Sequence, residues 1–196
     1  MVGGAAEGAW RGSPAECLGN GDRRPRGGRC DRPSGAWSIY VTVHAWRIVK
    51  AKHAGAAFTG EGARLYGGRW NSKGTAMVYT AGSASLAILE MLVHLDAHEI
   101  LGSYLLAEVT FEETLVQEMD RARLPTDWRM DPPPPAMRSL GDQWVAGIGS
   151  AVLRVPSVLV DSESNYLLNP AHGDFPAIVR TVPRPFVFDP RLLKIT

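Results

Sequence analysis

The segment YGGRWNSKGTAMVYTAGSASLAILEMLVHL, residues 66–95, contains a glycine-rich loop, a short apolar run and a long apolar helix in close succession. The run AMVYT, residues 76–80, has the length and composition of a strand. Ser83 or Ser85 then provides a side-chain oxygen that suits the N-cap of a helix, which we expect to continue through Leu95. The segment therefore predicts a strand that leads directly into a helix, with the glycine-rich loop before the strand.

Glu90 lies inside this predicted helix, where nearly all of its neighbours are apolar. The surrounding residues are Leu86, Ala87, Ile88, Leu89, Met91, Leu92 and Val93. A carboxylate in such a place needs a partner, because an unpaired buried carboxylate is costly or takes up a proton. No Lys or Arg lies one helical turn away, so a partner must come from elsewhere in the fold. Two interpretations stay open: a solvated position on a partly exposed helix, and a carboxylate that lines a pocket.

Short apolar segments separated by turns make up the remainder of the chain from residue 38 onward. We expect strands at AWRIV (45–49), YLLAEVTF (104–111), VPSVLV (155–160), SNYLLNP (164–170) and FVF (186–188). The prolines of DPPPPAM (131–137) predict an extended loop, and DQWVAGIGSAVL (142–153) predicts a helix. Asp189 suits the cap of a final turn, with Pro190 as its first residue. Many short strands and few helices predict an α+β domain, in which helices flank a small mixed β-sheet.

Composition narrows the class of protein. The chain has 196 residues, 45% of them hydrophobic, which suits one domain with a real core. A formal net charge of +1 argues against strong attraction to nucleic acid or to a membrane. Cys17 and Cys30 form neither a disulfide framework nor a four-ligand zinc pattern. With no apolar signal segment at the N-terminus, we expect a cytoplasmic protein.

Residues 1–37 differ from the rest because Gly, Arg and Pro dominate them. The stretch GNGDRRPRGGRCDRPSG has almost nothing to bury, so we expect a flexible tail, with the folded domain at residues 38–196. Three explanations stay open: a solvated tail, a basic arm that touches nucleic acid, and a translation start placed too early. In the last case, Val41 or Val43 is an alternative start.

Familiar catalytic and nucleotide-binding motifs do not match. Gly60 and Gly62 begin a dinucleotide-type pattern, but Leu65 occupies the position of its third glycine. Gly62 and Gly67 have the spacing of a P-loop, but the Lys and Ser/Thr that should follow are missing. The five histidines are scattered without nearby cysteine or paired aspartate ligands, so we expect no metal site.

Several polar side chains nevertheless lie in apolar or glycine-rich surroundings. Arg69 follows two glycines, where the backbone can approach a ligand and the guanidinium can bind phosphate. Trp70 is either a stacking wall or a core residue, and Arg47 is a second cation inside a predicted strand. Such arginines near Glu90 would suit a ligand with phosphates and a sugar, or a structural ion-pair cluster. Ser157, after Pro156, can satisfy a backbone group or take part in a site.

Two longer blocks resemble the RES-domain family of toxins from bacterial toxin–antitoxin modules. They are GEGARLYGGRWNSKGTAMVYTAGSASLAILEMLVHL and, much later, VPSVLVDSESNYLLNPAHGDF. They follow one another in the family's order, and the resemblance extends over about residues 43–195. The family takes its name from an Arg, a Glu and a Ser. By motif these are Arg69, Glu90 and Ser157, which the resemblance makes the catalytic residues.

The resemblance also implies a fold similar to that of ADP-ribosyltransferase toxins and a substrate, NAD, that is consumed. No other cofactor is expected. Tyr79 matches the family's pocket tyrosine, and Arg47 matches an arginine of the site in several members. With Trp70 and Asn169 they form the expected NAD-binding set, although asparagines such as Asn169 also serve in turns and at strand ends.

This activity would account for Glu90. Cleavage of the nicotinamide–ribose bond leaves an oxocarbenium-like ribose, which a fixed carboxylate stabilises. Nicotinamide leaves as a neutral base, so no strong general acid is required. Ser157 would hydrogen-bond the ligand or orient Glu90, and Tyr79 would stack on nicotinamide or ribose. Water, phosphate or a protein side chain remain possible acceptors of the ADP-ribose.

The resemblance implies an Xre-like helix-turn-helix antitoxin as the partner in a hetero-oligomer. That partner, and not this chain, would bind DNA, and no membrane association is expected. Two alternatives stay open. One is a protein ADP-ribosyltransferase that acts on a specific target, and the other is an inactive module that binds a nucleotide or a partner.

Overall fold

The computed structural model describes residues 41–95 and 103–193. The expectations for residues 1–37 lie outside this range. The principal elements are β1 (Thr42–Lys50), α1 (Glu61–Tyr66), β2 (Val78–Ala81), α2 (Ala84–Leu92), β3 (Tyr104–Glu112), β4 (Val116–Glu118), α3 (Pro135–Gly147), β5 (Val152–Pro156), β6 (Ser164–Leu168), β7 (Val179–Arg180) and β8 (Arg184–Phe186). Short 3₁₀ helices occur at Ala51–Ala56, Glu113–Leu115, Arg121–Arg123, Phe175–Ala177 and Pro190–Leu193.

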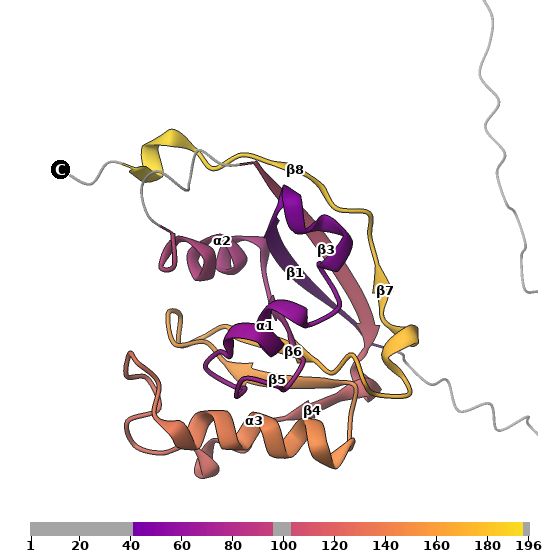
Figure 1. The fold of residues 1–196 in the computed structure, drawn as a ribbon, viewed down its shortest axis with the longest axis vertical. Coiled ribbons are helices and arrows are strands. Elements are labelled where there is room, and N and C mark those ends of the chain that lie inside the picture. Colours follow the sequence, from indigo (N-terminus) through magenta and orange to yellow (C-terminus); the bar gives the residue numbers. More distant parts are fainter. Residues whose placement is uncertain (1–40, 96–102, 194–196) are drawn as a thin grey trace, which may run out of the picture. The chain divides into compact units, whose positions relative to one another are not determined.

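The strands form one mixed sheet in the order β4-β5-β6-β2-β1-β3-β7, and β8 also pairs with β3 (Figure 1). The pair β4–β5 is parallel, whereas the other pairs are antiparallel. The predicted α+β class with a mixed sheet and flanking helices is therefore confirmed. No helix in residues 41–95 and 103–193 is long and apolar enough to cross a membrane.

The sheet opens between β1 and β2. These strands pair only at Trp46 and Ala81, whereas β1 pairs with β3 along its whole length and β2 pairs with β6 along its whole length. The sheet therefore consists of two well-paired halves that meet at one narrow point. The backbone of β2 beyond this point has no partner in β1, which leaves its carbonyls available to side chains.

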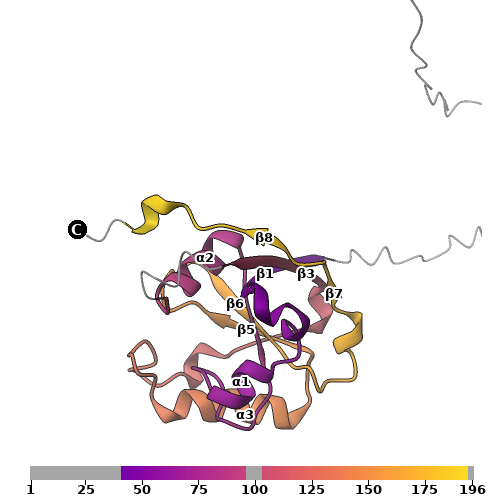
Figure 2. The same ribbon diagram turned by 45° about the horizontal axis from the view of Figure 1, so that its top comes forward.

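Three apolar clusters hold the halves and helices together. One lies between the sheet halves and includes Ala45, Val78, Val109 and Leu168. A second lies under α2 and a third lies under α3. Strands β5 and β6 pass between α2 and α3 in both ribbon views (Figures 1 and 2). The two helices therefore pack on different parts of the sheet.

Several predicted boundaries shift in the structure. The helix predicted at 142–153 is α3, which begins with Pro135 as its first residue and ends at Gly147. The proline stretch is thus a loop only as far as Pro134, because proline is well tolerated in the first turn of a helix. The strand predicted at 155–160 is β5, which ends at Pro156, and the chain bends at residues 158–159. The helix predicted to reach Leu95 ends at Leu92.

Candidate active site

Glu90 is half-buried on α2, and two neutral donors hold one of its oxygens. Asn165 Nδ2 donates to Glu90 Oε1 at 2.6 Å, and Ser157 Oγ donates to the same oxygen at 3.2 Å. Among the described residues, Glu90 Oε2 accepts no hydrogen bond and no cation forms an ion pair with this carboxylate. The carboxylate is therefore fixed through one oxygen, and the other is left without a hydrogen bond from the described residues.

Ser157 uses the whole bonding capacity of its hydroxyl group. The side chain is fully buried, and Oγ accepts from the backbone N–H groups of Leu159 at 3.1 Å and Val160 at 3.2 Å. A serine hydroxyl has one proton to donate and two lone pairs that accept. The proton goes to Glu90, and the two backbone groups take the lone pairs. Ser157 is therefore placed to orient Glu90 rather than to bind a ligand directly.

The loop between β5 and β6 is also tied to the start of α2. Ser83 is the N-cap of α2, and its Oγ accepts from Leu86 N at 3.0 Å. The same hydroxyl donates to Glu163 Oε2 at 2.7 Å, and Glu163 O accepts from Ser157 N at 3.1 Å. The N-terminus of the helix and the loop that holds its glutamate are thus one connected structure.

Tyr79 fixes the glycine-rich loop. Its hydroxyl accepts from Trp70 N at 3.0 Å and donates to Asn71 Oδ1 at 2.7 Å. Burial raises the pKa of Tyr79 above its usual range, so the hydroxyl keeps its proton and continues to donate. A Cβ at Gly68 would lie 2.5 Å from the tyrosine oxygen, so only glycine fits there. Tyr79 therefore positions the loop that carries Arg69.

Arg47 fills the opening between β1 and β2. Its Nη1 donates to the Tyr79 carbonyl at 2.6 Å, and its buried Nε has no hydrogen-bond partner. Burial lowers the pKa of Arg47 to about 10, which still leaves it a cation at neutral pH. No described carboxylate forms an ion pair with it. A half-buried cation without an acid is the arrangement that a bound anion would complete.

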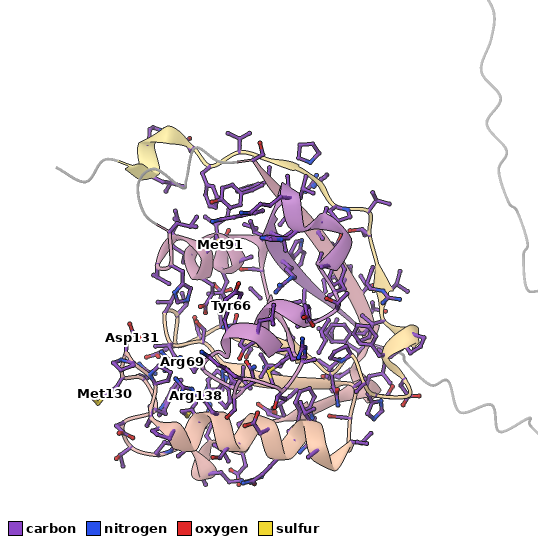
Figure 3. All side chains as sticks on the ribbon, viewed as in Figure 1. Tyr66, Arg69, Met91, Met130, Asp131 and Arg138 are labelled. Atoms are coloured by element: carbon purple, nitrogen blue, oxygen red, sulfur yellow. The ribbon has the colours of Figure 1, made fainter. Side chains whose placement is uncertain are left out.

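Arg69 extends toward the loop that precedes α3. Its Nη1 donates to the carbonyls of Trp128 at 2.8 Å and Met130 at 3.1 Å. Figure 3 shows Arg69 together with Arg138, Met130 and Asp131 beside the N-terminal end of α3. Since a guanidinium carries five N–H donors, the remaining ones are available to a phosphate.

The cluster around Tyr79 and the cluster around Glu90 are linked through the neighbouring strands β2 and β6, which carry Tyr79 and Asn165. Tyr79 and Ala81 are separated along β2 by about 7 Å, at about 3.3 Å per residue. Ala81 is directly paired with Asn165, which holds Glu90. No hydrogen bond between described residues joins the two clusters directly, so the sheet itself sets their spacing.

Two residues expected to contact NAD, Trp70 and Asn169, have buried side chains. Trp70 is only 3% exposed and packs in the cluster under α3, with Gly141 of that helix close against its carbonyl. Its burial favours the core interpretation over the stacking wall. Asn169 is fully buried, and its Oδ1 accepts from Ala171 N at 3.0 Å. It directly follows β6 and lies about 13 Å from Asn165, at about 3.3 Å per residue, so it does not join the contacts of Asn165 with Glu90.

Asn165 and Asn71 are the residues that the sequence interpretation missed. Both are asparagines near turn-forming residues, so their local surroundings resemble ordinary turn chemistry. The signal for Asn165 was its position in a strand next to Tyr166, where an amide is unusual unless it has a specific partner. Only the pairing of β6 with β2 shows that this partner is Glu90.

Comparisons with known proteins show which family the chain belongs to. The model of the RES domain matches residues 44–189. A protein of Yersinia enterocolitica named Toxin Res is 42% identical over 148 residues, which are 75% of this chain and 97% of that protein. A protein of Sphingobium sp. named Prs ADP-ribosylating toxin is 36% identical over 79% of this chain and 99% of its own length.

A solved structure has the same fold at low sequence identity. It is a chain of the M. tuberculosis MbcT–MbcA toxin–antitoxin complex, with a TM-score of 0.62 and 19% identity. The match covers 80% of this chain and 89% of that one. The extent of the family match and the identity to the Yersinia protein together show that this chain belongs to the RES domain family.

Proposed function

We propose that this chain is the NAD-consuming toxin of a toxin–antitoxin module, and that it cleaves the nicotinamide–ribose bond. The observation that carries the proposal is the carboxylate of Glu90. One oxygen is fixed by Ser157 and Asn165, and the other has no partner among the described residues. Membership of the RES domain family and relatives named as toxins support this function.

Glu90 would act on the ribose. As the bond to nicotinamide breaks, positive charge develops on the ribose in an oxocarbenium-like transition state. A carboxylate whose geometry is already set by two hydrogen bonds stabilises that charge without reorganising at the moment of reaction. Nicotinamide departs as a neutral molecule, so the site needs no strong general acid. The single fixed carboxylate is therefore sufficient for the chemistry.

The arginines would hold the pyrophosphate. Arg47 has an unpartnered Nε and no acid beside it, and Arg69 has unused donors on a loop that Tyr79 fixes. Charge-assisted hydrogen bonds from guanidinium groups to phosphate are among the stronger interactions that a site can offer. Tyr79 would contribute through its carbonyl, which orients Arg47, and its hydroxyl, which orients the Arg69 loop.

An antitoxin partner follows from the same proposal. The structural neighbour is part of a toxin–antitoxin complex, and a chain that consumes NAD has to be restrained in its own cytoplasm. We expect an Xre-like helix-turn-helix antitoxin that covers the site and supplies the DNA-binding function of the module.

A second candidate is ADP-ribosylation of a protein. It is favoured by the relative named Prs ADP-ribosylating toxin, which matches over 99% of its length. The first half of the reaction is shared, since both routes remove nicotinamide from NAD. They differ in whether water, phosphate or a protein side chain captures the ADP-ribose. An inactive binding module is a third candidate.

The test is the NAD content of cells in which this chain is induced without an antitoxin, beside a Glu90→Gln variant. The substitution preserves shape and removes the charge. We expect NAD to collapse with the native chain alone. A different result would support protein ADP-ribosylation: the NAD content stays steady, but a protein band becomes labelled when the NAD carries its label on the adenylate. Steady NAD without labelled protein would leave the inactive module as the better account.

A further inference from the structure

We infer that Asn165 is the positioning residue that sets the catalytic geometry of Glu90. Its Nδ2 donates to Glu90 Oε1 at 2.6 Å, which is shorter than the 3.2 Å bond from Ser157 to the same oxygen. The inference rests on the proposed function, since it concerns how the reacting carboxylate is held.

The backbone around Asn165 makes its amide a rigid support. β6 is paired on both sides, so that Asn165 lies between Ala81 of β2 and Val155 of β5. A side chain on a strand that is paired on both sides has little freedom to move relative to the sheet. Glu90 instead comes from α2, which packs on β1 and β2 through Leu86 and Ala87. The hydrogen bond therefore fixes the helix-borne carboxylate to the sheet.

The other end of the amide shows that the interaction with Glu90 determines its orientation. Asn165 Oδ1 is buried and has no hydrogen-bond partner among the described residues. A residue selected for stability alone would not leave a buried acceptor unsatisfied. The opposite orientation would place Oδ1 against the carboxylate and repel it. The unsatisfied oxygen is thus the consequence of directing the N–H group at Glu90.

Asparagine can also donate this hydrogen bond to Glu90 at every pH. An amide donates regardless of pH, whereas a carboxyl group of the same shape donates only when it is protonated. In Asn165→Asp the two carboxyl groups would lie within hydrogen-bond distance, so one of them retains a proton more strongly than an isolated carboxyl group. Ser157 would continue to donate to Glu90, which directs the shared proton to the introduced group.

The other ionisable side chains near this cluster do not bond Glu90. Glu163 accepts from Ser83, and Arg154 Nε donates to Ser164 Oγ at 3.2 Å. His94 lies one helical turn beyond Glu90 and is exposed, and Asp161 pairs with Arg129. All of these groups are unchanged in the Asn165 variants. A ratio of variant to native activity at each pH therefore removes their contributions.

The experiment measures nicotinamide release from NAD by the purified native chain and by Asn165→Asp, Asn165→Ala and Glu90→Gln, from about pH 5 to about pH 8. Gln117→Glu is the matched control, because it makes the same amide-to-acid change at an exposed residue of the edge strand β4. Thermal unfolding of every variant is followed over the same pH range.

For Asn165→Ala we expect kcat to fall about 10- to 100-fold with little change in KM.

For Asn165→Asp we expect the activity relative to the native chain to rise as the pH falls, because the protonated carboxyl group replaces the amide donor. Its melting temperature should approach the native value at low pH and decrease as the pH rises, since the second charge then forms beside Glu90. Gln117→Glu should show no pH-dependent change in relative kcat.

Two results separate the inference from the proposed function. If the native chain and Glu90→Gln release no nicotinamide, the function is wrong, and the pH-dependent melting of Asn165→Asp still tests the contact. If the native chain is active and Glu90→Gln is not, but relative kcat of Asn165→Asp is the same at every pH, the positioning role is overturned. Native kcat in Asn165→Ala would overturn it equally.

Discussion

Ser157 and Glu90 are 67 residues apart in the sequence, and Ser157 Oγ donates a hydrogen bond to Glu90 Oε1 at 3.2 Å. The same hydroxyl accepts from the backbone of Leu159 and Val160. One buried serine thus joins the carboxylate on α2 to the loop between β5 and β6. Since its hydroxyl is fully used, Ser157 would support the proposed site and would not be its nucleophile.

Ser157→Ala should therefore lower both stability and activity. Two backbone N–H groups and one carboxylate oxygen lose a partner, and we expect the free energy of unfolding to fall by about 1–3 kcal/mol. Some NAD cleavage should remain, because Asn165 still holds Glu90. Denaturant unfolding and kcat measure the two effects. A covalent ADP-ribose adduct at Ser157, detected by mass spectrometry of the native chain during turnover, would contradict this role.

Tyr79→Phe distinguishes positioning from stacking. The substitution retains the ring but removes the hydroxyl, so Trp70 N and Asn71 Oδ1 lose their shared partner. We expect a loss of about 1–3 kcal/mol in unfolding free energy and a higher KM for NAD, because the loop that carries Arg69 is less well fixed. Native stability and KM in this variant would show that only the aromatic ring matters.

Arg47→Met should separate substrate binding from stability. The native guanidinium is a half-buried cation without an acid, so an apolar side chain of similar length should change the unfolding free energy by less than about 1 kcal/mol. KM for NAD should rise about 10- to 100-fold, since charge-assisted bonds to phosphate are lost. Exposed Arg121 provides the control: Arg121→Met should leave KM unchanged. An unchanged KM in Arg47→Met would exclude phosphate binding by Arg47.

Asp142 gives the fold a defined response to acid. Burial acts to raise its pKa, but hydrogen bonds from Ser72 and Thr75 outweigh that effect and hold the pKa below the ordinary value of 3.8. A lowered pKa in the folded state contributes stability that is present above pH 3.8 and is lost as the pH falls through the folded value. We expect Asp142→Asn to be less stable than the native chain at neutral pH, with the difference shrinking below 3.8. Melting temperatures across this range measure the effect, and a constant difference would contradict it.

Much of the fold could be predicted from the local sequence. Alternation in AMVYT and the cap at Ser83 correctly predict β2 and the start of α2, because these signals depend on neighbouring residues. The start of α3 was misplaced because Pro135 has two opposite meanings: it breaks a helix interior and suits a first turn. The prolines alone do not distinguish the two.

The site could be predicted only in part, since it depends on pairing across the sheet. An apolar helix that contains Glu90 signals that a partner is needed, but not which residue supplies it. The partner Asn165 is 75 residues away, and β2–β6 pairing brings it near. The core position of Trp70 likewise depends on α3, which packs against it from far along the chain. Long-range pairing is the information that local patterns lack.

The most direct test of the central claim is nicotinamide release from NAD by the purified chain, with Glu90→Gln and the exposed control Glu118→Gln assayed in parallel. We predict rapid release by the native chain and by Glu118→Gln, and a loss of at least about 100-fold in Glu90→Gln, which keeps the shape of the side chain but not its charge. Equal release by all three proteins would contradict the assignment of Glu90 as the catalytic carboxylate.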